Sequence, residues 1–235
     1  MRTRTTNLSP VQLRRREQIG QERRERTRVK LIQAAYRLFA VHGADAPTID
    51  DVIAEAGVAR GTFYNHFKTR DELFGAVADD IATSINAVIR PAITGIGDAA
   101  TRLALAFRMF LRFALADEAR GWILLRTMPL VGPLNEEMKT FVQSEFEQAL
   151  ATGRMRSVSA AVATDLGIGL QIMTIHRVLV DRGGEAAIDA AAEALLVALG
   201  VDAAEARKIV SRPIPRDASA AIQSPAGLPP APRKR

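Results

Sequence analysis

The residues best suited to chemistry lie in one short run of this 235-residue sequence, GVARGTFYNHFKTRDELF, residues 57–74. The run joins a glycine turn, a short stretch of polar and aromatic residues, and a new helix start. Its first half contains two small side chains and two hydrogen-bond donors: Ala59, Gly61, Arg60 and Thr62. Small residues let a helix approach base edges closely, and the donors reach those edges. The pattern predicts a short helix that reads the major groove of DNA.

The second half of the run has groups suited to phosphate. The Tyr64 hydroxyl and the His66 imidazole match phosphate oxygens, although either residue alone is more often structural. Arg70 stands in the first turn of the next predicted helix, where a cation opposes the helix dipole at a cost of about 0.3–1 kcal/mol. A bound phosphate would offset that cost. Their joint placement in one run favours contact with the DNA backbone.

Two predicted helices position this run. The first of them, which starts near Arg28, carries apolar residues at helical spacing and is closed by Gly43. The second has Thr48 as its N-cap and ends at Gly57, and its first-turn acids are better explained as cap residues than as catalysts. The residues predicted to face the core are Leu31, Ile32, Ala35, Tyr36, Leu38, Phe39, Ile49, Val52, Ile53, Val58, Phe63 and Phe67.

The N-terminus is predicted to form a separate basic extension. Ser9, Pro10 and Gln12 form a helix start, and residues 14–28 are strongly charged with few apolar positions. Gly20 weakens a helix there by about 1 kcal/mol relative to alanine. We expect a fraying helical arm whose order depends on DNA.

The remaining chain is predicted to form helices separated by Gly and Pro, with no period-two segment long enough for a sheet. The predicted helices are residues 69–89 (stopped by Pro91), 99–116, 122–128 (ended by Pro129 and the Gly132-Pro133 break), 134–151, 159–180 and 185–199. From Pro213 an Ala/Pro-rich tail lacks the apolar content to fold. The expected fold is all-α. Its expected domains are a basic extension (1–26), a three-helix DNA-binding unit (27–74), a larger helical dimerisation and effector domain (75–210) and a disordered basic tail (211–235).

Composition narrows the function class. Cysteine is absent, which rules out disulfides and thiolate metal sites. No apolar run is long enough to span a bilayer, and the N-terminus lacks a secretory signal, so we expect a cytoplasmic protein without membrane contact. The three histidines are far apart in sequence, and neither a metal nor another cofactor is expected.

Charge is concentrated at the two ends. The first thirty residues hold ten Lys or Arg against three acids, and residues 207–235 hold seven against one. Residues 31–206 hold fifteen against twenty-two. A mildly acidic body with basic ends fits a polyanion that is bound at the ends. For the C-terminal tail, a merely solvated segment is an equally good interpretation.

From about Arg28 to Phe74 the chain resembles the TetR family of transcriptional regulators, whose pattern G-V-s-x-G-T-l-Y-x-H-F is matched almost letter for letter. The resemblance implies that residues 59–65, Asn65 included, form the recognition helix. It also implies that the DNA backbone is held by Arg28, Thr48, Tyr64, His66 and Arg70. Lys68 stands where proline is frequent and Arg70 where lysine is usual, and both keep or add positive charge.

The same resemblance implies a homodimer formed by the last two long helices, 159–180 and 185–199, and a pocket for an unknown small molecule. The residues proposed for this pocket are Phe107, Phe110, Trp122, Met128, Phe141, Met173 and His176, with Phe146 as a further aromatic. Each of them is more often plain core. His176 in particular is more often a satisfied core or interface histidine than a ligand.

These observations favour a homodimeric regulator of transcription, expected to be a repressor, that binds a palindromic operator on double-stranded DNA. A small apolar or amphipathic effector would release it. Repression and activation both fit the residues. A second hypothesis is a sequence-tolerant architectural DNA-binding protein without an effector, in which the basic arm and tail dominate the affinity. An enzyme is not expected, because no nucleophile-base pair, phosphate loop or metal spacing occurs.

Overall fold

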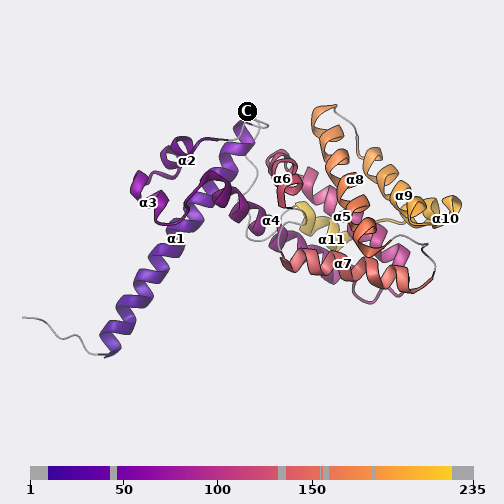
Figure 1. Cartoon of the computed structure of the whole chain (residues 1–235), viewed down its shortest axis with the longest axis horizontal. Helices are drawn as coiled ribbons and strands as arrows, with labels where there is room; N and C mark the ends of the chain where they lie inside the picture. The colour runs from indigo at the N-terminus through magenta and orange to yellow at the C-terminus, as the bar shows by residue number, and fades with distance from the viewer. Residues whose placement is uncertain are drawn as a thin grey trace, which may run out of the picture.

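The computed structural model describes residues 10–42, 47–131, 136–153, 155, 159–181 and 184–223, and every regular element among them is a helix (Figure 1). The N-terminal unit comprises α1 (Pro10–His42), α2 (Ile49–Ala56), α3 (Arg60–Tyr64) and the start of α4 (Arg70–Ile93). The body comprises the rest of α4 with α5 (Ala99–Leu115), α6 (Glu118–Val131), α7 (Glu136–Ala151), α8 (Ala160–Val180), α9 (Ala186–Ala198), α10 (Ala203–Val210) and α11 (Arg216–Gln223). The predicted all-α fold, a helix-turn-helix unit followed by a larger helical domain, is confirmed.

The small unit closes around aromatic residues contributed by several of its helices. Phe39 from α1 meets Phe74 from α4 edge to face, with ring centroids 4.9 Å apart. Phe63 on α3 is fully buried, and the residues that the sequence analysis turned inward are buried or partly buried. Gly57 ends α2 in the left-handed conformation, at φ 61°, as the sequence predicted.

α1 is longer than expected, because the predicted basic arm is its direct continuation. The helix runs without a break from Pro10 to His42, and residues 14–26 are exposed along it. A packed helical segment acts as the nucleus, so that extending it costs less than starting a separate helix. Ser9 and Gly43, the predicted ends of these segments, lie outside the described residues.

Two prolines that were expected to stop helices lie inside them. α4 continues through Pro91 to Ile93, and α6 runs from Glu118 past Pro129 to Val131 instead of covering residues 122–128. A proline removes one backbone donor, and its cost is smallest near the end of a helix, where the chain leaves the helix soon afterwards. Gly132, Pro133 and the predicted helix start at residue 134 lie outside the described residues.

The C-terminal region contains two helices that the sequence analysis missed. α10 starts at the Asp202 side chain, which accepts hydrogen bonds from two backbone N–H groups, and α11 buries Ala218 and Ile222. The expectation of an unstructured segment from residue 211 is therefore wrong as far as residue 223. Residues 224–235 lie outside the described part. No helix among the described residues has the length and apolar character needed to cross a bilayer.

Candidate nucleic-acid interface and cavity

α3 exposes polar residues on one side because the Phe63 side chain packs its other side into the core. Phe63 is fully buried, whereas Tyr64 beside it is 47% exposed, with its ring edge-on to Phe63 at 5.4 Å. The predicted base-reading residues on and around α3 are exposed or half-buried: Ala59, Arg60, Gly61, Thr62 and Asn65. The five-residue helix is therefore held by its buried side and open on its other side.

In the absence of DNA, Arg60 forms an ion pair with a side chain of the protein itself. Its guanidinium lies 3.2 Å from the Asp50 carboxylate of α2, and both side chains are well exposed. An exposed ion pair of this kind contributes about 0–1 kcal/mol. Exchanging this ion pair for a hydrogen bond to a base edge would therefore cost Arg60 little free energy.

Thr48 and Asp51 form a reciprocal cap at the start of α2. The Thr48 hydroxyl accepts a hydrogen bond from the Asp51 N–H at 3.2 Å, and the Thr48 N–H donates to the Asp51 carboxylate at 2.8 Å. The N-cap predicted from the sequence is confirmed. Thr48 is exposed, but its hydroxyl also donates to Asp51 at 2.7 Å, so a phosphate would share it with the cap.

The start of α4 is capped by Thr69 and Glu72. The Thr69 hydroxyl accepts a hydrogen bond from the Glu72 N–H at 3.1 Å, and the Glu72 carboxylate accepts one from the backbone N–H of Lys68 at 2.6 Å. The Lys68 side chain is exposed. The Arg70 guanidinium lies 5.6 Å from the centre of the Phe74 ring, and no ion pair to it occurs among the described residues. This cation–π contact offsets part of the dipole cost and leaves the N–H donors of Arg70 available.

α1 adds two arginines to this surface. Arg28 lies over the Phe67 ring at 5.8 Å, and Arg24 donates to the backbone carbonyl of Asn65 at 3.4 Å. Burial, followed by the charges of Arg24 and Arg28, lowers the pKa of His66. His66 is therefore neutral at pH 7 with one N–H to donate. Sequence reasoning missed Arg24, since nothing in the motif connects it to the end of α3.

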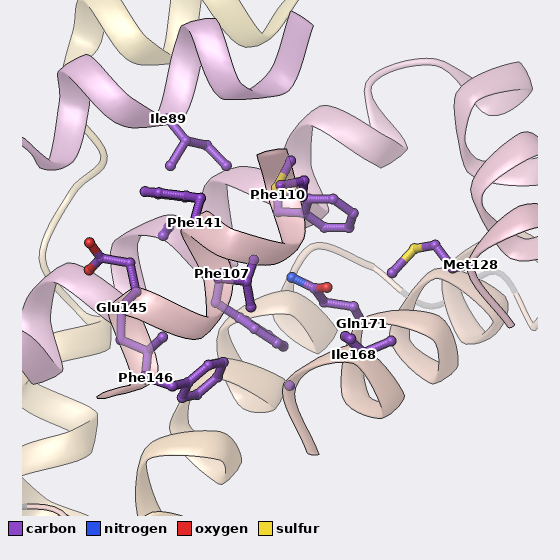
Figure 2. Close-up of a pocket in the computed structure, with 14 residues that line it drawn as sticks. Ile89, Phe107, Phe110, Met128, Phe141, Glu145, Phe146, Ile168 and Gln171 are labelled. Atoms are coloured by element: carbon purple, nitrogen blue, oxygen red, sulfur yellow. The ribbon is translucent and has the colours of Figure 1, made fainter. Parts of the chain in front are cut away.

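The body contains an apolar cavity between α5, α7 and α8 (Figure 2). Its lining residues are Ile89, Leu103, Ala106, Phe107, Phe110, Met128, Met138, Phe141, Val142, Glu145, Phe146, Gly167, Ile168 and Gln171. Five residues named from the sequence are among them, namely Phe107, Phe110, Met128, Phe141 and Phe146. The structure brings these five together, and their role in binding a ligand stays a prediction.

Two polar side chains interrupt this apolar lining. Glu145 accepts a hydrogen bond from the Arg102 guanidinium at 2.5 Å, and both side chains are mostly buried. The Gln171 amide points into the space beside Phe107 and Phe110 in Figure 2, and no partner for it occurs among the described residues. The cavity therefore offers one compensated charge and one free amide to a ligand.

The other three residues proposed for the pocket lie elsewhere. Trp122 is half-buried on α6 and does not line the cavity. Met173 is 56% exposed on α8, and His176 is also exposed on that helix. Met173 belongs to a row of exposed apolar residues on α8 with Val162, Leu166 and Val180, and Val197 is exposed on α9.

A second, larger hollow lies between α5, α9 and the segment before α11. Its volume is about 620 Å³, and Arg108 and Arg112 line it. Both arginines lie close to Asp189, at 2.8 Å and 3.6 Å, so these charges are matched within the protein. The cavity between α5, α7 and α8 has the more apolar lining and is the better candidate for a small apolar ligand.

Comparison with known proteins identifies both parts of the chain. The family profile "Bacterial regulatory proteins, tetR family" matches residues 31–77, and "Tetracyclin repressor-like, C-terminal domain" matches residues 98–212. The HTH-type transcriptional repressor Rv3405c of Mycobacterium tuberculosis is 38% identical over 66 residues, which are 28% of this chain and 35% of that protein. TtgR, a transcriptional regulator of Pseudomonas putida, is 38% identical over 60 residues, which are 26% of this chain and 29% of TtgR. These matches thus span about a third of each relative.

Solved structures extend the similarity to most of the chain. The crystal structure of RolR in complex with resorcinol is 30% identical, covers 83% of this chain and 97% of RolR, and superimposes with a TM-score of 0.65. A tetR-family regulator from Shewanella sp. PV-4 is 16% identical with a TM-score of 0.61 over 75% of this chain and 99% of its own, which shows the shared fold. The named relatives are regulators of transcription and not enzymes.

Proposed function

This chain belongs to the tetR family of bacterial regulatory proteins, and we propose that it is a homodimeric repressor released from a palindromic operator by a small aromatic effector. The observation that carries the proposal is the position of α6. It lines the cavity through Met128, and Asp117, just before its first turn, accepts a hydrogen bond from Tyr36 of α1. A ligand in the cavity therefore acts on a helix that contacts the DNA-binding unit.

The proposed DNA contacts divide by chemistry. Residues of α3 and its two caps meet base edges: Ala59, Arg60, Gly61, Thr62 and Asn65. Residues at the end of α3, in the loop after it and on the neighbouring helices meet phosphates: Arg28, Thr48, Tyr64, His66, Lys68 and Arg70. All of them are exposed or half-buried. The proposed domains are the extension 1–26, the DNA-binding unit 27–74 and the effector and dimerisation domain from residue 75.

The proposed dimer uses the exposed faces of α8 and α9. Val162, Leu166, Met173 and Val180 recur along one side of α8, and these apolar side chains are between 37% and 56% exposed. An apolar row of this length on one helix indicates a protein interface. A twofold arrangement places two copies of α3 on successive turns of a duplex, which is the geometry that a palindrome requires.

The proposed effector is aromatic and carries a hydroxyl group. Phe107, Phe110 and Phe146 supply ring contacts, and Gln171 supplies one free amide. An aromatic ligand with a hydroxyl group would contact the rings and form a hydrogen bond with the amide at the same time. RolR, at 30% identity, has been crystallised with resorcinol, a ligand of this class.

Two measurements test the proposal separately. Selection from a random duplex library should recover one palindrome, and recovery of random DNA would contradict the sequence-specific part. Thermal unfolding with resorcinol, phenol and toluene tests the effector: at about 100 times the Kd, a ligand adds about 2.7 kcal/mol of stability. We expect resorcinol and phenol to raise the Tm more than toluene does, and Gln171→Leu to remove that difference. If no compound changes the Tm, the proposed effector class is wrong, whatever the selection yields.

A further inference from the structure

The N-terminal half of α1 is a rigid surface that the contacts proposed above leave unused. Figure 1 shows it extending alone past α2 and α3. Arg24 contacts the carbonyl of Asn65 at the end of α3, so residues 10–23 lie beyond the base-reading helix. Fourteen helical residues extend about 21 Å.

The cations of the α1 segment from Arg15 to Lys30 are sorted by face. At 100° per residue, one arc of about 100° contains five of them: Arg15, Arg16, Arg23, Arg26 and Lys30. The acids of the segment, Glu17, Glu22 and Glu25, fall outside this arc. We call these five residues the basic stripe. It is about 22 Å long.

The basic stripe stabilises nothing within the protein. All five side chains are exposed, and none makes an ion pair among the described residues. Like charges on one helix face repel one another, so the stripe costs free energy in the isolated chain. A row of cations that the fold does not use indicates a polyanionic partner.

The geometry points to a second DNA contact: we propose that the basic stripe binds the phosphate backbone of duplex DNA outside the base pairs read by α3. The stripe is continuous with the DNA-binding unit through α1 and lies on the other side of the helix from Arg24 and Arg28, which face that unit. Each strand of duplex DNA carries one phosphate per 3.4 Å of the helix axis, so 22 Å of one strand presents about six phosphates to the five cations. A membrane surface fits poorly, because Ile19 is the one large apolar residue within the arc.

The first test uses the triple variant Arg16→Gln, Arg23→Gln, Lys30→Gln and a random-sequence duplex, which requires no operator. Each phosphate that the variant no longer binds should reduce the salt slope of log K by about 0.9, so three per subunit reduce it by about 2.7. The matched control is Arg126→Gln, Lys208→Gln, Arg216→Gln, which removes three exposed cations from the body. If the two triple variants have the same slope, or if the stripe variant keeps the wild-type slope, the proposal is wrong.

The second test uses flank length. Two duplexes carry the palindrome recovered by selection. The longer one has about eight added base pairs on each side and extends to the basic stripe, whereas the shorter one ends before it. The wild type should bind the longer duplex at least about tenfold more tightly, and the stripe variant should bind both equally while retaining its preference for the palindrome. Equal wild-type affinity for both duplexes would overturn the proposal. The site of α3 is present in both, so this result leaves the proposed function intact.

Substitutions at Gly20 distinguish a helical basic stripe from a general electrostatic effect of the extra positive charge. A Cβ there meets no atom within 4 Å, so alanine fits, whereas proline breaks the helix without changing its charge. Gly20→Ala should retain the gain from flanking DNA and Gly20→Pro should lose most of it. If the two variants behave alike, a helical stripe is excluded.

Discussion

At the residue scale, a variant of Arg70 tests a contact that should affect DNA affinity without affecting DNA sequence preference. Its guanidinium touches Phe74 and makes no ion pair among the described residues, so an approaching phosphate displaces no protein partner. Arg70→Ala should weaken binding to every duplex and reduce the salt slope by about 0.9 for each phosphate that Arg70 neutralises in the wild type. Fluorescence anisotropy over a salt series measures both quantities. An unchanged slope would remove Arg70 from the backbone contacts.

Arg60 provides the contrasting variant, because it lies on α3 with the exposed Asp50 as its partner. Arg60→Ala should change which base is preferred at one position of each half-site, at a cost of about 1–3 kcal/mol for the original base. Selection repeated with the variant measures the change. The same preference in both selections would show that Arg60 does not read bases.

The lowered pKa of His66 predicts that DNA binding depends on pH. Burial and the neighbouring cations lower its pKa in the free protein, so it is neutral at pH 7. A phosphate beside the ring raises that pKa, and binding then takes up a proton. Affinity should therefore rise as the pH falls from about 7.5 to about 6. His66→Gln should bind with a weaker pH dependence across this range, and an identical dependence would place the titrating group elsewhere.

The sequence predicted individual site residues where a local pattern determines their position. The Thr48 cap, the buried Phe63 and the exposed Tyr64 all follow from spacing within one motif. The cavity was predicted only in part, since Phe107 and Phe110 line it and Trp122 does not. Which of two helix faces turns inward depends on the packing of α5 to α8, and aromatic character alone does not encode it.

At the element scale, a buried polar cluster joins α1 to α6. The Tyr36 hydroxyl donates to the Asp117 carboxylate at 2.5 Å, and Arg120 lies over the Phe113 ring at 4.4 Å and donates to its carbonyl at 2.8 Å. Burial, and then the charge of Asp117, raises the pKa of Tyr36 far above its ordinary value, so the hydroxyl stays a donor. The cluster is nearly inaccessible to solvent, and its geometry fixes how α6 meets the DNA-binding unit.

Tyr36→Phe should both destabilise the protein and weaken the link between cavity and DNA. Losing the donor leaves a buried carboxylate short of one hydrogen bond, at a cost of about 1–3 kcal/mol in urea unfolding. An effector should then release less DNA at saturation. Thr127→Val is the matched control, because it removes a buried hydroxyl bond within α6 itself, to the carbonyl of Ile123. If both variants retain the wild-type release, Tyr36 is structural only.

The sequence predicted a helix wherever a capping residue and apolar residues at helical spacing indicate the same segment. It predicted the exact ends of the helices less well. Ser159 caps α8 as its sequence indicates, and Gly57 ends α2. Pro91 and Pro129 did not end their helices, because tertiary packing can stabilise a last turn that has one hydrogen bond fewer. α10 and α11 are eight residues each, too short for a clear period, and they exist because Ile209 and Ile222 are buried against the body.

At the scale of the whole molecule, the N-terminal unit and the body expose different kinds of surface. The basic residues lie on α1 of the N-terminal unit, and the exposed apolar row lies on α8 of the body. An isolated chain would leave this row in water, at a free-energy cost proportional to its area. Pairing of two chains removes that cost and gives two DNA-binding units a fixed separation.

Leu166→Glu with Met173→Glu should therefore separate the dimer. Both side chains are exposed in the single chain, so the substitutions leave its core intact, whereas two buried charges per subunit oppose association. Light scattering should give twice the 25.5 kDa chain mass for the wild type and the single mass for the variant. Affinity for the palindrome should fall by about 10²–10⁴, because the second half-site no longer benefits from linkage to the first.

Ala87→Glu is the matched control, since it adds a charge to an exposed position of α4 away from the apolar row. It should retain the dimer mass and the affinity for the palindrome. The affinity of the double variant for a single half-site should equal that of the wild type, because α3 and its neighbours are untouched. A variant that stays dimeric would place the interface on another face, and a wild type of single mass would exclude the twofold model of operator binding.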